Sequence, residues 1–244
     1  MALPINTSPM YTVEVPSTKE SIKFRPSLVK EEKALLIAQH SENAQTMIDT
    51  LKEVIKSCTN GKVNADTLAT FDLEYLFMNL RARSVEEVVN LKYKCNNTVK
   101  NDKGEDTVCN GSFDYDVNLL EIEPTRHAEH ESKFMLNDRI GISLRYPTFE
   151  MVQKYEQMEE NEIMVNILID CIDFLYDDDQ IYHAKDSSRK ELEEFVDSMQ
   201  QKDLEKIKVF FDTMPELKKD IHFKCPKCGY EEDIVVRGMQ NFFA

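Results

Sequence analysis

Cys225-Pro-Lys-Cys-Gly-Tyr230 is the stretch of this sequence with the clearest structural meaning. Two cysteines separated by two residues and followed by a glycine form half of a tetrahedral zinc site. The flanking residues 220–224 and 232–237 favour extended structure, and Gly229 can adopt the positive φ of a tight turn between two strands. A redox Cys-X-X-Cys motif would precede a helix instead, and no helical period follows. The stretch therefore predicts half of a zinc ribbon.

The best candidates for the other half are Cys95 and Cys109. Extended residues 88–93 lead into the first cysteine and residues 113–119 follow the second, so the pair repeats the order strand, cysteine, strand. Thirteen residues separate the two cysteines, which is more than a knuckle usually has. We interpret this insertion as a polar excursion that turns near Gly104.

Together these residues predict one closed Zn²⁺ site, since zinc in structural sites has four ligands. Its predicted ligands are Cys95, Cys109, Cys225 and Cys228, with His222 in reserve. The alternative is that the first two cysteines are free thiols. A closed thiolate shell leaves no position for water, so we expect a structural metal that contributes on the order of 10 kcal/mol to folding. It would bring the two ends of a long insertion together.

Composition limits the classes of protein to consider. The chain has 244 residues, 41% of them hydrophobic, which is enough for a sizeable core. Its net charge of −15 opposes binding to nucleic acid or to anionic membrane surfaces. No apolar run approaches the ~20 residues of a membrane span, and no signal-peptide pattern begins the chain, so we expect a cytosolic protein. The remaining cysteines, Cys58 and Cys171, fit a helix end and an apolar core position.

Periodicity predicts the elements of the N-terminal half. Residues 11–15 and 21–25 alternate as a hairpin, and residues 29–57 have the spacing of an amphipathic helix with a break near 40–43. A second helix is predicted for residues 66–83, and Ser84-Val-Glu-Glu87 fits a capping box for one further turn. Phe71, Tyr75 and Met78 form an apolar stripe on the second helix, which favours burial over a partner-facing surface.

The following segment combines a hairpin with helices. Residues 132–136 and 139–144, joined at Asn137-Asp138, are predicted to pair and to share the sheet of the zinc unit. Beyond Tyr146 we predict helices packed as a small bundle, over residues 147–158, 162–176, 188–199 and 203–213. We interpret His127 and His130 as part of a solvated turn, and Asp177-Asp-Asp179 as a solvated acidic turn and not a calcium loop. Residues 238–243 are expected to cover the sheet or to dock on a partner.

These elements predict an α+β fold: a small antiparallel zinc-ribbon-like β unit with N-terminal helices and an inserted helical bundle. The predicted domains are an arm and hairpin at 1–26, a helical segment at 27–87, the ribbon-like domain at 88–146 with 216–244, and the inserted subdomain at 147–215.

Several longer stretches resemble the baseplate hub assembly proteins of T-even-like contractile-tailed bacteriophages. The resemblance is carried by Phe24-Arg-Pro-Ser-Leu-Val-Lys-Glu-Glu-Lys33, Leu73-Glu-Tyr-Leu-Phe-Met-Asn-Leu-Arg81, Ser84-Val-Glu-Glu87, Leu144-Arg-Tyr-Pro-Thr-Phe149, Phe210-Phe-Asp-Thr-Met-Pro215 and Cys225-Pro-Lys-Cys-Gly229. It implies virion assembly in the host bacterial cytoplasm, with other baseplate hub proteins as partners. Whether the protein stays in the virion tail baseplate, and its oligomeric state, are left open.

No catalytic motif supports an enzyme: the sequence lacks a nucleophile elbow, a phosphate-binding glycine loop and a zincin helix. The alternative function is a zinc-ribbon regulator that binds nucleic acid or polymerase. That function needs a basic face on the ribbon. The nearby Lys92, Lys94, Lys224, Lys227 and Arg237 are opposed by Glu231, Glu232 and Asp233.

Overall fold

The computed structural model describes residues 7–41, 43–155 and 157–238. It divides into two compact units, of which unit 1 comprises the described residues within Met1–Val63, Phe71–Pro124 and Glu216–Ala244, and unit 2 comprises Asn64–Thr70 and Thr125–Pro215. Helices and antiparallel strands occur together, which confirms the α+β class. The four-part division of the chain is finer than these units and stays a prediction. Within the described ranges, no helix is both long enough and apolar enough to cross a bilayer.

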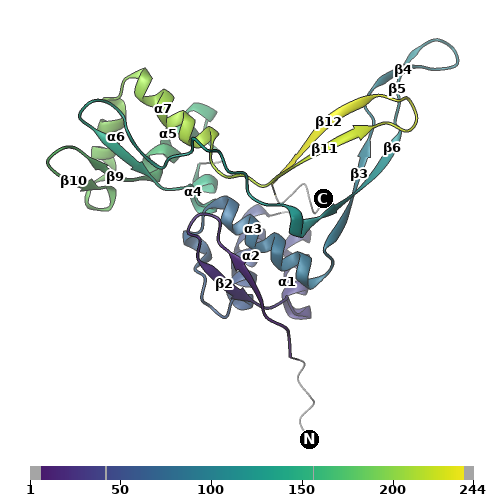
Figure 1. The fold of residues 1–244 in the computed structure, drawn as a ribbon, viewed down its shortest axis with the longest axis horizontal. Helices are drawn as coiled ribbons and strands as arrows, with labels where there is room; N and C mark the ends of the chain where they lie inside the picture. The colour runs from purple at the N-terminus through teal and green to yellow at the C-terminus, as the bar shows by residue number, and fades with distance from the viewer. Residues whose placement is uncertain (1–6, 42, 156, 239–244) are drawn as a thin grey trace, which may run out of the picture. The chain divides into compact units, whose positions relative to one another are not determined.

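Unit 1 begins with a hairpin and two helices in the predicted order. Their bounds are β1 Tyr11–Glu14, β2 Ser21–Phe24, α1 Val29–His40 and α2 Ala44–Cys58 (Figure 1). The hairpin is attached to the helices through Arg25, whose guanidinium donates to the buried carboxylate of Glu31 (2.8 Å) and whose N–H donates to the carbonyl of Cys58 (3.0 Å). The hairpin and the break in the long helix are both confirmed.

Helix α3, Thr70–Ser84, has buried residues on more than one side. Phe71 and Met78 are buried and Tyr75 is half-buried, so the predicted stripe is core, and the alternative of a partner-facing surface is wrong. The helix starts later than predicted, because residues 65–67 form only a short turn (η1, Ala65–Thr67).

The end of α3 also corrects a prediction. Ser84 does not cap a new turn, because it is the last residue of α3. Its hydroxyl donates to the carbonyl of Leu80 (2.6 Å) and accepts the N–H of Ser27 (2.8 Å).

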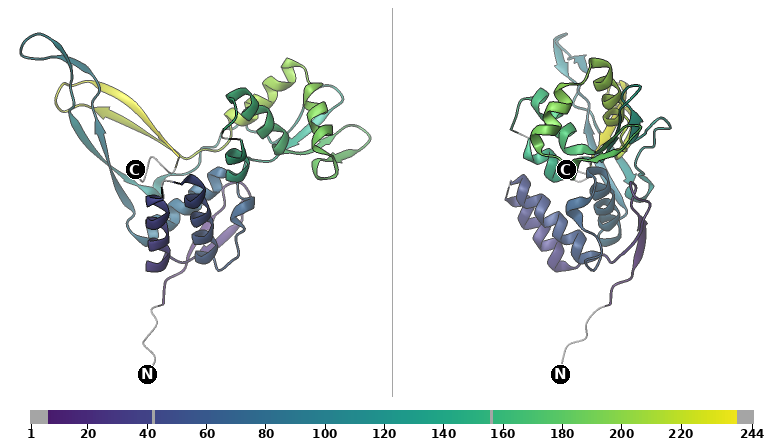
Figure 2. Two further views of the ribbon diagram at one scale, coloured as in Figure 1. Left: turned by 180° about the vertical axis from the view of Figure 1, so that it is seen from behind. Right: turned by 90° about the vertical axis from the view of Figure 1, so that its left-hand side faces the viewer.

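Two long ribbons complete unit 1. Strand β3 (Val88–Lys94) pairs with β6 (Ser112–Asn118), and β11 (Lys218–Lys224) pairs with β12 (Glu231–Arg237), both antiparallel. Figures 1 and 2 show the two ribbons running side by side. At one end their inward side chains pack on α3 around Met78, Val117 and Ile221. At the other end they meet in a small core that contains cysteines.

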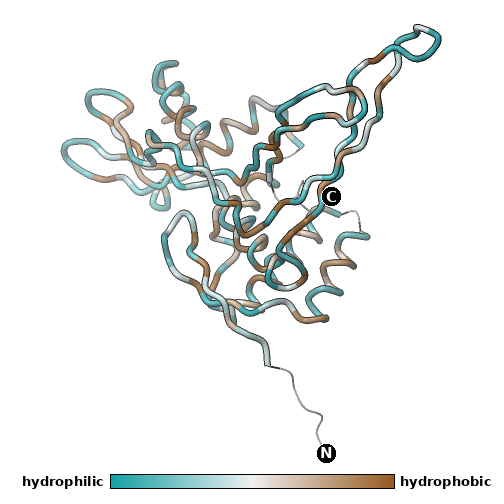
Figure 3. The backbone as a smooth tube through the Cα atoms, turned by 45° about the vertical axis from the view of Figure 1, so that its right-hand side comes forward, coloured by the Kyte–Doolittle hydropathy of each residue, from teal (hydrophilic) through white to brown (hydrophobic). Residues whose placement is uncertain are grey.

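The polar excursion between Cys95 and Cys109 is a third hairpin, β4 (Thr98–Lys100) with β5 (Asp106–Val108). It turns where predicted, because Gly104 has a φ of +80°. The loop is hydrophilic, as the teal colour in Figure 3 shows, and all residues from 100 to 108 are exposed. A short turn, η2 (Leu119–Glu121), follows β6.

Unit 2 is built on a four-stranded antiparallel sheet in the order β10-β9-β8-β7. Its strands are β7 Lys133–Met135, β8 Gly141–Leu144, β9 Ile172–Tyr176 and β10 Ile181–His183. The hairpin of β7 and β8 is confirmed, but its predicted place in the zinc unit's sheet is wrong, because β8 pairs with β9 on its other side.

Residues 172–176 correct a second prediction, because they form strand β9 and not the end of a helix. Helix α5 (Glu160–Cys171) ends where the strand begins. A continuous apolar run is compatible with either structure, so periodicity could not decide. The pairing with β8 depends on Gly141, where a Cβ atom would lie 2.0 Å from Cζ of Tyr176.

The remaining elements of unit 2 are helical: α4 Phe149–Lys154, η3 Ala184–Asp186, α6 Arg189–Asp197 and α7 Gln201–Asp212. The predicted capping box at Ser188 and Glu191 is present at the start of α6. The helices do not form a separate bundle. They share one core with the sheet, made by buried residues that include Ile142, Ile172 and Phe210. The expected apolar tail at 238–243 lies outside the described residues, apart from Gly238.

Candidate metal centre

The four cysteines chosen from the sequence come together at the end of the two ribbons of unit 1. Their sulfur atoms all lie within 4.8 Å of one another. Sγ of Cys95 lies 3.7 Å from Sγ of Cys228, and Sγ of Cys109 lies 3.7 Å from Sγ of Cys225. These separations are far longer than a disulfide bond of about 2.05 Å, and all four thiols are free.

The backbone of the C-terminal knuckle holds its two cysteines in a tight turn. The N–H of Cys225 donates to the carbonyl of Tyr230 (2.8 Å), and the N–H of Gly229 donates back to the carbonyl of Cys225 (2.9 Å). This second bond requires a residue with positive φ, and Gly229 has a φ of +74°.

The N-terminal knuckle repeats this pattern in spite of its insertion. The N–H of Cys95 donates to the carbonyl of Gly111 (2.8 Å), and the N–H of Asn110 donates to the carbonyl of Cys95 (3.0 Å). Asn110 occupies the position in this pattern that Gly229 has in the other knuckle, and it also has a positive φ, of +51°. The hairpin between the cysteines is closed by the N–H of Cys109, which donates to the carbonyl of Asn97 (2.8 Å). The interpretation of the two segments as equivalent knuckles therefore agrees with their hydrogen bonds.

Gly111 lets the two knuckles approach each other. A Cβ atom at this position would lie 2.7 Å from Sγ of Cys225 and 3.0 Å from Cβ of Lys227. A side chain here would push the opposite knuckle away. The signal for this packing role in the sequence is a glycine two residues after a candidate ligand.

A small aromatic core lies beneath the sulfur atoms. Phe223 is fully buried, and its ring lies 4.5 Å from that of Tyr93 and 5.6 Å from that of Phe113, between centroids. Cys95, Cys109 and Cys225 are buried as well, whereas Cys228 is partly exposed. The sulfur cluster is thus closed on most sides by protein.

The electrostatic environment differs among the thiols. Burial raises the pKa of Cys95 and of Cys109, which favours their neutral forms. The backbone N–H of Tyr230 lowers the pKa of Cys228. The ammonium of Lys227 lies close by and donates to the carbonyl of Cys109 (2.6 Å). Four thiolates could not share this buried site without a compensating cation, because their charges would repel.

The donor set and its geometry fit a tetrahedral metal ion. With Zn–S bonds of about 2.3 Å, sulfur atoms in a regular tetrahedron lie about 3.8 Å apart. The two measured separations of 3.7 Å agree with that value. Thiolate sulfur is a soft ligand, which selects zinc, copper(I) or iron over magnesium and calcium. The four cysteines could therefore hold one metal ion in a closed shell.

The histidines considered from the sequence lie elsewhere. His222 is exposed on β11 and its Nδ1 lies 2.8 Å from a carboxylate oxygen of Asp233, so it does not belong to the sulfur group. His130 corrects the interpretation of a solvated turn. Its ring stacks on the rings of Tyr146 and Phe210 in unit 2, at centroid distances of 5.6 and 5.2 Å, and those two rings also contact each other at 5.7 Å.

The hydrogen bonds of His130 determine its tautomer. The hydroxyl of Thr213 donates to the carbonyl of Val209 (2.6 Å), so it must accept at 2.8 Å from Nδ1–H of His130. Nε2 then accepts the hydroxyl of Tyr146 (2.8 Å). The sequence showed no signal for this packing, because the partners are distant in the chain.

The aspartate triplet is a turn, as predicted. It connects β9 and β10, where the carboxylate of Asp177 accepts the N–H groups of Asp179 (2.9 Å) and Gln180 (2.8 Å). These bonds lower the pKa of Asp177. The carboxylate oxygens of Asp177 therefore accept hydrogen bonds within the turn itself.

Comparison with known proteins places nearly the whole chain in one family. No solved structure matches it significantly. The baseplate hub assembly protein gp26 of Enterobacteria phage T4 is 25% identical over 234 residues, which cover 96% of this chain and 97% of the relative. The family model of the T4 bacteriophage base plate protein matches residues 8–244, and the chain therefore belongs to that baseplate protein family.

Proposed function

We propose that this protein is a zinc-stapled, non-enzymatic factor or subunit that promotes assembly of the central hub of a phage tail baseplate. The observation that carries the proposal is the similarity to a baseplate hub assembly protein over nearly the full length of both chains. The range matched by the family model, residues 8–244, spans both units of the structure and all four cysteine positions. Other baseplate hub proteins are the proposed partners, encountered in the host bacterial cytoplasm.

Zinc is the metal we propose for the cysteine cluster, with Cys95, Cys109, Cys225 and Cys228 as ligands. Its role is structural, because four protein sulfurs complete the preferred shell of zinc and leave no position for substrate or water. The metal would join the ribbons β3–β6 and β11–β12 at the end that lies away from α3. The rigid arm that results is a suitable element for an assembly protein.

The alternative of a regulator that binds nucleic acid is not favoured by the charges on the ribbons. Lys224 pairs with Glu231 (2.6 Å) and Arg237 pairs with Glu216 (3.1 Å). Lys227 donates to a backbone carbonyl of the opposite knuckle. Binding to phosphates requires several cations on one face, and three of the five cations named near the cysteines are already engaged within the protein.

The test is a phage from which the gene has been deleted, complemented with plasmid-borne variants. We expect the deletion to stop hub formation, so that wedges accumulate without complete tails in electron micrographs of infected cells. The wild-type gene should restore hubs and infectious particles. A variant with serine at Cys225 and Cys228 should not restore them. Normal infectious particles from the deletion alone would overturn the proposal. The zinc-ribbon regulator would then become the favoured function.

A further inference from the structure

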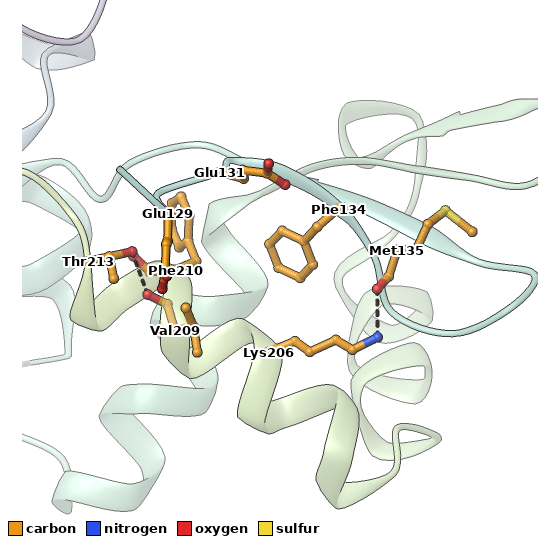
Figure 4. A pocket seen from close by; sticks show the side chains of 8 residues that line it. All are labelled: Glu129, Glu131, Phe134, Met135, Lys206, Val209, Phe210 and Thr213. Atoms are coloured by element: carbon orange, nitrogen blue, oxygen red, sulfur yellow. Dashed lines mark hydrogen bonds between the residues drawn. The ribbon is translucent and has the colours of Figure 1, made fainter. Parts of the chain in front are cut away.

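A second surface, in unit 2, has the character of a docking site. A groove of about 300 Å³ lies between β7 and α7 (Figure 4). We call it the β7–α7 groove. Phe134 and the buried Phe210 form its floor, while Met135 and Val209 are 42% and 49% exposed beside them. Apolar side chains that line a concave surface and remain this exposed are typical of binding sites.

The charged side chains around the groove differ in whether they have hydrogen-bond partners within the described protein. Lys206 spans one end, and its ammonium donates to the carbonyls of Met135 (2.9 Å) and Leu136 (2.7 Å), as Figure 4 shows for the first of them. Glu129 and Glu131 are exposed on the rim and form no hydrogen bond or ion pair with the described residues. The cation is therefore engaged by the backbone, whereas the two carboxylates are available to a ligand.

The hydrogen bonds of the backbone around the groove limit the ways in which a partner could bind. Strand β7 is an edge of the four-stranded sheet, where a foreign strand could add in principle. Lys206 occupies the carbonyls of Met135 and Leu136 on this segment, which blocks continuous pairing there. The remaining mode of binding is insertion of a side chain from the partner against the apolar floor. The volume of the groove fits one or two large side chains.

We propose that the β7–α7 groove binds a segment of another baseplate protein that presents one large apolar side chain flanked by lysine or arginine. The apolar side chain would pack on Phe134 and Val209, and the flanking cations would pair with Glu129 and Glu131. A second copy of this chain is a poor occupant, because each copy has a net charge of −15 and the copies repel. The proposal rests on the proposed function and names the chemistry of its partner.

The test uses the purified full-length protein and fluorescent, overlapping 15-residue peptides that cover the other baseplate proteins of the same phage. We expect the binding peptides to share an apolar residue next to basic ones. Val209→Lys should weaken their binding at least about tenfold, as loss of an anchor contact does. Val165→Lys is the matched control, because Val165 is 44% exposed on α5 of the same unit and does not line the groove. It should bind as the wild type does.

Exchanging the charges of the rim and of the peptide tests whether the rim carboxylates contact the peptide. The double variant Glu129→Lys and Glu131→Lys should lose binding in a salt-dependent way, and peptides with glutamate in place of their basic residues should recover it. Failure of every peptide to bind, or binding unaffected by Val209→Lys, would overturn the proposal. Self-association that Val209→Lys abolishes in sedimentation experiments would assign the groove to a second copy and overturn it as well.

Complementation separates this proposal from the assembly function. If the gene deletion stops hub formation and Val209→Lys restores it fully, the groove proposal fails and the assembly function stands. If the deletion itself forms normal hubs, the assembly function fails. If Val209→Lys does not restore hubs whereas Val165→Lys does, both proposals are supported, provided that both variants melt at the wild-type temperature.

Discussion

The cysteine end of unit 1 and the core of unit 2 are stabilised in different ways. Among the described residues, the core cluster of unit 2 has nine buried apolar residues, contributed by a four-stranded sheet and its helices. The corresponding cluster of described residues at the cysteine end has four buried apolar residues, of which three are cysteines, on ribbons of two strands each. Two-stranded ribbons are marginally stable alone. The proposed zinc ion would supply at the cysteine end the stabilisation that apolar burial supplies in unit 2.

The strongest test of this comparison is removal of the metal. The purified protein should contain about one zinc per chain, and Cys225→Ser should abolish that content and destabilise the ribbons by several kcal/mol, since structural zinc contributes on the order of 10 kcal/mol. Elemental analysis and amide hydrogen exchange of β3, β6, β11 and β12 would show both effects. Cys171→Ser is the control, because this buried thiol lies in unit 2 outside the sulfur group. A folded wild-type protein without metal would refute the comparison.

The second test breaks the core of unit 2 instead. Phe210 is 1% exposed, and Phe210→Ala should reduce the stability of unit 2 by about 3–5 kcal/mol because of the cavity left behind. Zinc content should stay at the wild-type level, since Phe210 belongs to the core of unit 2 and the cysteine cluster belongs to unit 1. Thermal melts combined with elemental analysis would measure the two responses. Loss of zinc in this variant would show that the two cores are not independent.

A smaller effect is expected for a substitution that tests how closely the two knuckles must approach each other. Gly111→Ala should cost about 1–3 kcal/mol, the usual range for an overpacked site, because its Cβ would lie 2.7 Å from Sγ of Cys225. Zinc should bind more weakly, which competition with a chromophoric chelator would measure. Ser112→Ala, at the next and exposed position, should leave the affinity unchanged. Equal affinities for both variants would mean that the knuckles do not need this close approach.

The smallest expected effect is a pH dependence confined to unit 2. Burial, and secondarily the charge of His127, lower the pKa of His130 in the folded protein. The unfolded chain therefore binds a proton at His130 more readily than the folded protein does. The folded protein keeps the full stability contributed by neutral His130 at pH values above about 6.5, the usual histidine pKa. This contribution is lost as the pH falls below that value. Thermal melts at pH 7.5 and pH 5.5 should differ less for His130→Gln than for the wild type.

The control for this measurement is His40→Gln, which replaces an exposed histidine at the end of α1. It should keep the pH dependence of the wild-type protein. An unchanged slope in the His130 variant would show that protonation of this ring does not destabilise the folded state.

The sequence by itself determined the features that depend on neighbouring residues. The N-terminal hairpin, the break in the first long helix and the capping box at Ser188 all follow from local patterns, and all are present. The choice of Cys95 and Cys109 as partners of the C-terminal knuckle was possible because each knuckle has its own turn signal, an Asn-Gly or a Gly.

Only the tertiary structure decided which segments pair across long distances. Residues 172–176 became a strand because β8 offers a partner with Gly141 beneath Tyr176. His130 became part of a core because Thr213 and Tyr146 satisfy both of its ring nitrogens. The β7–α7 groove likewise combines segments more than sixty residues apart. Periodicity records how a segment alternates between apolar and polar residues, but the burial and hydrogen bonds that select its structure are supplied by partners that only the folded chain brings near.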